Sequence, residues 1–480
     1  MNVKKWDTAE LVFDGPSDGN PFKEISLEGI FRYGNRSVRV PGFYDGNGTY
    51  KLRFMPDKEG LWSCETLSNS CRLSGQKREF TCLPPDAESH GPVRAANCRH
   101  FAYEDGTPYY QVGTTCYAWI HQDARLRKMT LDTLRSAPFN KLRMCIFPKN
   151  YVFNQNNPEH FPFPGDEEHG FDFSRFDVQY WKQLDECVLA LQDLGIEADI
   201  ILFHPYDKGR WGFDRMSRDT DDFYLQYAVA RLSGYRNIWW SIANEYDLMT
   251  EKASSDWDHF GEFVQKLDPA RHLRSIHNAR LFYNHNKPWV THCSIQSSDI
   301  KDIPLWLGRY ANKPLVLDEC RYEGNIANRW GNITAKEMVS RFWDCMVRGI
   351  YCGHGETYIN ENDELWWSKG GELVGESPAR IGFFRELLSQ MPNSFGPLTM
   401  DNNNRTRPIC GVEGEVYYYY ANSSQPVITH FTVPSDQKYF VDIIDTWNMR
   451  INTLDDLYTG AFDIPLPGNE YNAVRLRRAD

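Results

Sequence analysis

The sequence has no long apolar run and no excess of basic residues. No segment approaches the roughly 20 consecutive apolar residues that a membrane span needs, and the first residues, Met1 to Asp7, are not followed by the apolar segment of a signal peptide. We therefore expect no membrane partner and a cytoplasmic protein. The formal net charge of −12 at pH 7 argues against nucleic acid as a partner.

Paired cysteine motifs are also missing. Cys64, Cys71 and Cys82 lie near one another in the chain, but none of them forms a Cys-x2-Cys pair. A cysteine zinc site is therefore not expected, and we predict no metal and no other cofactor. Several of the 12 cysteines fall in predicted strands or helices of the central domain, where reduced core thiols are expected: Cys116, Cys145, Cys187, Cys293, Cys320, Cys345 and Cys352.

The length and the pattern of apolar residues predict three domains. A chain of 480 residues exceeds the usual size of one domain. Residues 1–84 read as short alternating strands separated by turns, which predicts an amino-terminal β-sandwich. A Pro-rich linker follows at 85–98, then a central domain at 99–392. Residues 393–480 return to strand-like runs and predict a carboxy-terminal β-sandwich.

Strands and helices alternate in the central domain, which is the pattern of an α/β (β/α)8 TIM barrel. Its predicted strands are 110–116, 142–147, 197–203, 238–243, 273–277, 290–295, 314–318 and 350–355. The clearest helical patterns are 178–194, 223–232, 257–267, 335–347 and 378–388. The long loop from Pro148 to Asp177 has the length of a functional lid.

Two strands of this barrel end on acidic residues. The apolar run 238–243 is followed by Asn244 and Glu245, and the run that begins at Pro314 ends on Asp318 and Glu319. The second glutamate lies about three βα units after the first, so both are expected at the carboxyl edge of the barrel, where such barrels keep their chemistry. Two facing carboxylates suit the cleavage of a glycosidic bond, because one donates a proton and the other attacks the anomeric carbon.

With these residues the chain resembles a clan A glycoside hydrolase. The amino-terminal phrases 40–46 and 56–62 are similar to those of the sandwich that precedes apiosidase-like barrels. The resemblance implies that Glu245 is the acid/base, Glu319 the nucleophile and Asn244 the partner of the sugar 2-hydroxyl. It also implies a retaining enzyme with a small carbohydrate substrate, and it favours pentosides or deoxy-sugars of plant origin.

Further residues at strand ends are predicted to bind the substrate or to orient the pair. Arg143 in the second strand is expected to hold Glu319 ionised. The other predicted substrate-binding residues are Trp119, His121, His204, His277, His292, Gln296, Glu356 and Tyr358. The sequence departs from the clan in two places: the sixth strand has no tyrosine, and the eighth offers Glu356 where many members place a tryptophan.

Two other functions remain open on the sequence alone. A metal-dependent hydrolase could use His204, His277, His292 and Asp318, although the first strand lacks the His-x-His that such barrels usually carry. A non-catalytic carbohydrate-binding protein of the same fold would be expected to have lost one glutamate, and both are present. The closing groups at the strand ends favour an exo-acting enzyme for short glycosides, and a homo-oligomer is possible.

Overall fold

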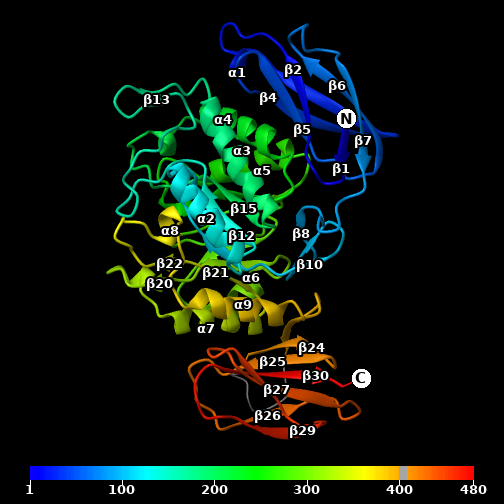
Figure 1. Cartoon of the computed structure of the whole chain (residues 1–480), viewed down its shortest axis with the longest axis vertical. Coiled ribbons are helices and arrows are strands. Elements are labelled where there is room, and N and C mark those ends of the chain that lie inside the picture. The colour runs from blue at the N-terminus through cyan, green and yellow to red at the C-terminus, as the bar shows by residue number, and fades with distance from the viewer. Residues whose placement is uncertain (399–407, 480) are drawn as a thin grey trace.

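The chain forms three parts that follow one another along the long axis of the molecule (Figure 1). The structure is a computed structural model, and it describes residues 1–398 and 408–479. The amino-terminal strands lie at one end, the helices and parallel strands in the middle, and the carboxy-terminal strands at the other end. The middle part carries the site, so the flanking parts are described briefly.

The amino-terminal part is a β-sandwich around an aromatic core. Its strands are β1 (Asn2–Lys4), β2 (Ala9–Asp14), β3 (Leu27–Tyr33), β4 (Arg36–Tyr44), β5 (Thr49–Phe54), β6 (Gly60–Ser68) and β7 (Lys77–Leu83), with the short helix α1 (Pro21–Glu24). The first half of β4 pairs with β3 and its last residues pair with β5, so the sheet folds over on itself. Phe31, Leu52 and Trp62 are fully buried between the layers, as the alternating pattern predicts.

A small antiparallel sheet joins this sandwich to the barrel. It consists of β8 (Val93–Ala95), β9 (Phe101–Tyr103) and β10 (Pro108–Tyr109). The range predicted as a linker, 85–98, therefore contains one short strand, β8, which pairs with β9. Phe101 on β9 packs against Trp239 of the barrel, with the ring centroids 5.1 Å apart.

Eight parallel strands form the predicted barrel. They are β11 (Gly113–Thr115), β12 (Lys141–Cys145), β15 (Glu197–Phe203), β16 (Ile238–Ala243), β17 (Leu273–Ser275), β18 (Cys293–Gln296), β19 (Leu315–Glu319) and β21 (Tyr351–His354). Their order in the sheet is β17-β16-β15-β12-β11-β21-β19-β18. A parallel bridge between His277 and Ser294 joins the two ends of this order and closes the barrel. The predicted fold class is confirmed.

Helices cover the outside of the barrel. They are α2 (Ala124–Ser136), α3 (Val178–Asp193), α4 (Arg218–Leu232), α5 (Ser254–Leu267), α6 (Ile303–Arg309), α7 (Ala335–Val347) and α9 (Ser377–Leu388). The short helix α8 (Trp366–Lys369) lies instead at the carboxyl edge, where the amide of Tyr117 donates to Trp367 O at 3.1 Å. Side chains of Asp123, Asp177, Ser217 and Thr334 accept backbone hydrogen bonds at the starts of α2, α3, α4 and α7, which satisfies donors that a helix start leaves free. All five predicted helical ranges coincide with helices, and α3, α7 and α9 agree with them within one residue. α4 and α5 begin earlier than predicted, α4 directly after the Ser217 cap.

The loop from Pro148 to Asp177 is anchored over much of its length. It contains the hairpin β13 (Gly165–Asp166) and β14 (Gly170–Phe171). Phe163 is fully buried and stacks on Phe176 with ring centroids 5.3 Å apart. Phe163 and Phe176 of the loop whose length suggested a lid therefore belong to the packed flank of the barrel, and the residues near Tyr151 lie close to the site described below.

The carboxy-terminal part is a second sandwich. A six-stranded sheet, in the order β23-β24-β25-β30-β27-β28, faces the pair β26-β29. The bounds are β23 (Gly396–Leu398), β24 (Ile409–Val412), β25 (Val416–Tyr420), β26 (Ile428–Thr432), β27 (Tyr439–Asp445), β28 (Arg450–Thr453), β29 (Ala461–Pro465) and β30 (Asn472–Arg478). Trp343 of α7 stacks on Tyr420 of β25 at 5.8 Å, so this sandwich packs on the barrel's helices.

Buried charges fix the amino-terminal sandwich to the barrel. Arg53 of β5 donates to both carboxylate oxygens of Asp185 on α3, at 2.7 and 2.9 Å. Arg231 of α4 donates to Asp185 at 2.7 Å and to Asp45 of the sandwich at 2.8 Å. All four residues are buried. Two cations and two anions are thus matched across the domain boundary.

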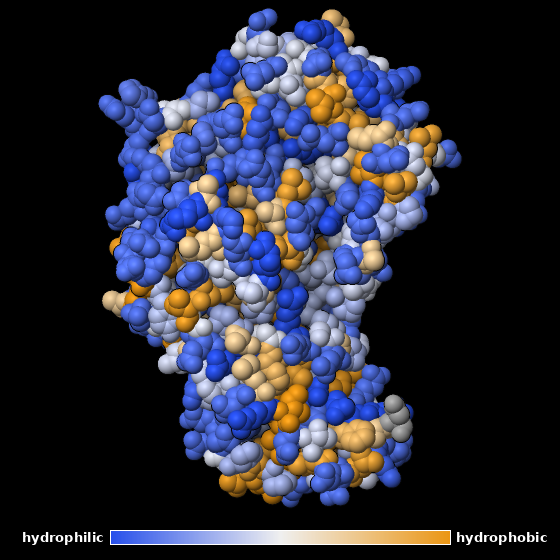
Figure 2. All heavy atoms as spheres, viewed as in Figure 1, coloured by the Kyte–Doolittle hydropathy of each residue, from blue (hydrophilic) through white to orange (hydrophobic). Residues whose placement is uncertain are grey.

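The surface and the thiols complete the description. The face in Figure 2 is mostly hydrophilic, with apolar residues scattered over it and gathered in places on the two sandwiches. Within 1–398 and 408–479, no helix combines the length and the apolar character needed to cross a membrane. The 12 cysteines are all free, and most are buried, as expected for core thiols.

Candidate active site

Glu245 and Glu319 lie at the carboxyl edge of the barrel. Glu319 is the last residue of β19, and Glu245 follows β16 by two residues. The backbone of Glu245 has φ +48°, in the left-handed region that residues other than glycine rarely adopt. Such a conformation is kept where the surrounding structure holds it, and it is frequent at functional sites. Here it turns the chain sharply between β16 and the 3-10 turn that starts at Tyr246.

Glu319 is surrounded by donors. The hydroxyl of Tyr117 donates to its Oε1, His277 Nε2 lies 3.2 Å from the same oxygen, and Arg143 Nη1 lies 3.5 Å away. Burial by itself would raise the pKa of Glu319, but the hydrogen bonds and charges of His277, Arg143 and Tyr117 lower it to about 2. Glu319 is therefore ionised at neutral pH.

Glu245 has the opposite environment. Its side chain is 8% exposed, Gln296 Nε2 donates to its Oε1 at 3.0 Å, and its Oε2 has no partner in the described structure. Burial first, and then the negative charge of Glu319, raise the pKa of Glu245 to about 7. A carboxyl with this pKa can hold a proton at neutral pH and has a free oxygen with which to donate it.

A chain of hydrogen bonds joins the two glutamates. Gln296, which donates to Glu245, also lies 3.3 Å from His277 Nε2 through its own Oε1. Ser294 Oγ donates to Asp318 Oδ2 at 2.6 Å and lies 2.9 Å from His277 Nδ1. Because Ser294 gives its one proton to Asp318, its oxygen accepts from His277 Nδ1. His277 donates from Nε2 to Glu319 at the same time when it is the imidazolium, which carries a proton on each ring nitrogen. His277 therefore orients the second glutamate.

Asn244 is held beside this chain. Its Oδ1 accepts from Arg143 Nη2 at 3.0 Å and lies 3.4 Å from the Tyr117 hydroxyl. Its Nδ2 is buried and has no partner among the described residues. The amide is therefore oriented with its donor free, as the binding of a sugar hydroxyl would require.

Four predicted substrate-binding residues are placed elsewhere, and these predictions need correction. Trp119 is 0% exposed and donates to Met144 Sδ, so it cannot stack on a sugar. His121 Nε2 bonds Ile146 O at 2.8 Å. His204 bonds Phe147 O through Nε2 and accepts from the amide of Tyr206 through Nδ1, which leaves no group for a ligand. His292 is buried between Phe101 and Trp239.

Glu356 and Tyr358 belong to a separate cluster. Glu356 lies directly beside Glu323, because β22 (Glu356–Thr357) pairs with β20 (Glu323–Gly324). Glu356 accepts from the amides of Val374 and Gly375, and the Tyr358 hydroxyl lies 3.4 Å from Glu323 Oε1. Burial, with a contribution from Glu323, raises the pKa of Glu356 to about 7. These carboxylates hold the loop before α9.

The residues of the metal-hydrolase alternative do not form one ligand set. Only His277 and Asp318 among them join the network of Glu319, and Asp318 is paired with Lys141 at 2.7 Å. In the described part of the chain, the one group of side chains close enough to hold an ion is Glu323, His354 and Glu356. None of the three was among the metal ligands considered from the sequence, although Glu356 was predicted to bind the substrate. The two carboxylates already accept backbone hydrogen bonds.

The sequence interpretation missed two residues of the site. Tyr117 follows the first strand, and its hydroxyl donates a hydrogen bond to Glu319. Lys149 follows the second strand, and its ammonium lies over the ring of Tyr117 at 3.8 Å. Position at a strand end was the available signal for both, but their direction depends on the loops around them.

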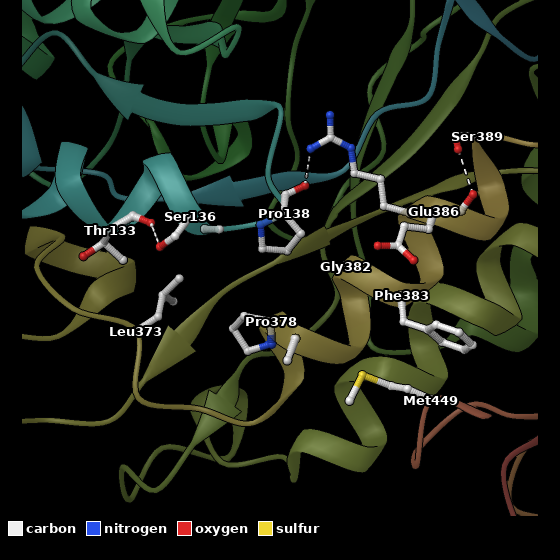
Figure 3. A pocket seen from close by; sticks show the side chains of 13 residues that line it. Thr133, Ser136, Pro138, Leu373, Pro378, Gly382, Phe383, Glu386, Ser389 and Met449 are labelled. Atoms are coloured by element: carbon white, nitrogen blue, oxygen red, sulfur yellow. Dashed lines mark hydrogen bonds between the residues drawn. The ribbon is translucent and has the colours of Figure 1, made fainter.

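A hollow on the outside of the barrel is separate from this site. It has a volume of about 880 Å³ and lies between α2 and α9 (Figure 3). Leu373, Pro378 and Phe383 line it, with Met449 of the carboxy-terminal sandwich at its edge. Neither Glu245 nor Glu319 contributes to its lining.

Comparison with protein families gives three matches along the chain. Residues 95–372 match the model described as "Apiosidase-like, catalytic domain". Residues 2–69 match a domain of unknown function, DUF5060, and residues 406–477 match another, DUF5605. Among curated proteins, no sequence matches the chain.

Solved structures similar to this chain include one of similar length and arrangement. A protein from Bacteroides vulgatus ATCC 8482, provisionally named a glycoside hydrolase, is 35% identical over 100% of both chains, with a TM-score of 0.94. A family 5 glycoside hydrolase from the same organism is 14% identical, with a TM-score of 0.63 over 81% of this chain and 94% of its own. At that identity the second likeness concerns the fold alone.

Proposed function

The chain belongs to the family of apiosidase-like catalytic domains and is a glycoside hydrolase of the clan A type. From this premise we propose that it retains the anomeric configuration of its substrate. We also propose that it is exo-acting on short plant-derived glycosides or oligosaccharides. In this proposal Glu319 is the nucleophile and Glu245 the acid/base. The alternatives without glycosidic chemistry have no comparable set of contacts in the described residues.

The observation that carries the proposal is the opposite environment of the two glutamates. The pKa of Glu319 is lowered to about 2 by its donors, and the pKa of Glu245 is raised to about 7 by burial and by Glu319. Two carboxyls whose pKa values are separated in this way are suited to the roles of nucleophile and proton donor. Contacts, not position alone, therefore distinguish the two roles.

The proposed reaction has two displacements. Ionised Glu319 attacks the anomeric carbon, while protonated Glu245 gives its proton to the leaving oxygen, so that a covalent glycosyl-enzyme forms and the aglycone leaves. Glu245, now ionised, takes a proton from water, which attacks the same carbon and frees Glu319. Asn244 Nδ2 is free to bind the sugar 2-hydroxyl in both steps.

The pH dependence of kcat/KM tests the assignment of Glu245. Because the acid acts in its protonated form, the rate is expected to fall as the pH rises above about 7. The acidic limb, which requires ionised Glu319, is expected far lower, near the pKa of about 2 or where the protein unfolds. In Glu245→Gln, the alkaline limb should disappear on an aryl glycoside whose leaving group needs no acid. An unchanged limb would assign it to another group.

The exo mode is supported by groups that gather on one side of the pair. Lys149 is surrounded by the rings of three tyrosines from three different loops, Tyr117, Tyr151 and Tyr206, and by the ring of Trp367 on α8. Such a cluster can enclose one terminal sugar, whereas an open cleft needs subsites on both sides of the bond.

Product analysis on an oligosaccharide labelled at its reducing end tests this mode. We expect release of monosaccharide from the non-reducing end, with the labelled product shortened by one sugar at a time. An early ladder of internal products would contradict the exo mode without contradicting hydrolysis itself.

A further inference from the structure

A buried lysine lies within four aromatic rings at the mouth of the barrel. The ammonium of Lys149 is 3.8 Å from the ring centre of Tyr117, 3.9 Å from that of Tyr206, 4.4 Å from Tyr151 and 5.1 Å from Trp367. The three tyrosines come from the loops after β11, β15 and β12, and Trp367 lies on α8, which follows β21 and β22. Attraction between a cation and ring faces holds the ammonium in place, but rings accept none of its hydrogen bonds.

The ammonium of Lys149 has no hydrogen-bonding partner within 1–398 and 408–479. The Lys149 side chain is 1% exposed, and among the described residues no carboxylate lies within 4.0 Å and no acceptor within hydrogen-bond distance of the ammonium. Lys149 Nζ is nevertheless absent from the fully buried side-chain atoms that lack a hydrogen-bond partner. The small exposed area of the residue therefore includes Nζ. Burial lowers the pKa of Lys149 to about 8, and it is mostly charged at neutral pH.

Tyr117 connects Lys149 with Glu319. The ammonium lies over the ring of Tyr117, and the Tyr117 hydroxyl donates a hydrogen bond to Glu319. A sugar with its anomeric carbon at Glu319 would therefore extend along the Tyr117 ring toward Lys149. The charges of Glu245 and Glu319 also act on Lys149, although neither is in contact with it.

We propose that the ammonium of Lys149 binds a carboxylate on the sugar whose bond is cleaved, so that the preferred substrates are uronides. The activity part of this proposal rests on the proposed hydrolysis, but the binding part does not. The three N–H groups of Lys149 donate hydrogen bonds to the carboxylate, and the rings of Tyr206 and Trp367 form the sides of the sugar-binding pocket.

A carboxylate fits this environment better than a hydroxyl. Hydrogen bonds between an ammonium and a carboxylate are about twice as strong as neutral ones, and the rings around Lys149 exclude water, which strengthens the charge interaction. A neutral sugar would leave the buried cation uncompensated. The other cations of the site are already paired, Lys141 with Asp199 and Asp318, and Arg143 with Glu319.

The test compares substrates that differ only at C6. Aryl glucuronides and galacturonides, as both anomers, are set against the matching glucosides and galactosides, with the wild type and Lys149→Met. Methionine keeps the length of the side chain among the rings and removes the charge. We expect the wild type to favour a uronide by roughly 10²-fold or more in kcat/KM, and Lys149→Met to lose that preference. Lys128→Met, on the exposed face of α2, is the matched control and should retain it.

Binding provides a readout that does not depend on turnover. Calorimetry with D-glucuronate, D-galacturonate, glucose and galactose should show binding of a uronate to the wild type, and loss of it in Lys149→Met. Uronate binding through Lys149 without cleavage of any aryl glycoside would support the inference and contradict the proposed hydrolysis. Cleavage of neutral glycosides with no preference for uronides, or an equal loss on both classes in Lys149→Met, would overturn the inference and leave hydrolysis intact.

Discussion

Replacing Glu319 by glycine should reduce kcat on an aryl glycoside by at least about 10⁴-fold, because the variant has no group to form the covalent intermediate. The contacts around the position make the loss specific: Tyr117, His277 and Arg143 all converge on this carboxylate. The measurement is turnover of whichever nitrophenyl glycoside the wild type cleaves. Glu372→Gly, at an exposed position outside any helix, is the control and should keep full activity.

Added azide separates the two glutamates. In Glu319→Gly, azide can take the place of the missing carboxylate and attack the anomeric carbon from the face opposite the leaving group. The glycosyl azide should therefore have inverted configuration. In Glu245→Gly the glycosyl-enzyme still forms on a substrate with a good leaving group, and azide should then give the retained product. The configuration is read by NMR. Exchange of these two outcomes would reverse the roles, and inversion by the wild type would exclude retention.

Replacing Asp185 by alanine should destabilise the protein by about 3–5 kcal/mol, since it leaves two buried guanidinium groups without their shared partner. Arg53 and Arg231 both donate to this carboxylate, at 2.7 Å. In denaturant, the first unfolding transition should have its midpoint at a lower denaturant concentration than in the wild type, because the junction between sandwich and barrel is affected first.

Asp132→Ala is the matched control for this prediction. Asp132 also pairs with two cations, Lys128 and Arg135, but on the exposed face of α2. Exposed pairs contribute about 0–1 kcal/mol, so the transition should scarcely move. Equal shifts in the two variants would show that the buried cluster has no special role at the junction.

The sequence allowed the fold to be predicted because the barrel strands are buried on both faces. β15 and β16 are fully buried along their length, so apolar residues dominate them, as at 200–203 and 238–240, and the strands end visibly on His204 and Asn244. The same reasoning placed Glu245 and Glu319 at one edge. Arg143 and Gln296 were expected near them, and the structure brings both into contact with the pair.

The errors have a common physical cause. A polar or aromatic residue after a strand can turn into the barrel mouth or into its wall, and the sequence does not state which. Trp119 turns into the wall, whereas Tyr117, two residues earlier, turns to Glu319. Glu356 was predicted to bind the substrate because it lies at the end of the eighth strand. Its neighbour Glu323 is 33 residues away in the chain, and only the pairing of β20 with β22 joins them.

Closure of the barrel and alignment of the nucleophile occur at the same place. The bridge between His277 and Ser294 is the last link between β17 and β18, and the side chains of the same two residues fix the hydrogen bond to Glu319. A folding intermediate with this seam open could hold every other strand in register and still lack an oriented nucleophile. During refolding, recovery of activity would therefore report the pairing of β17 with β18, and it would come later than any signal from the rest of the barrel.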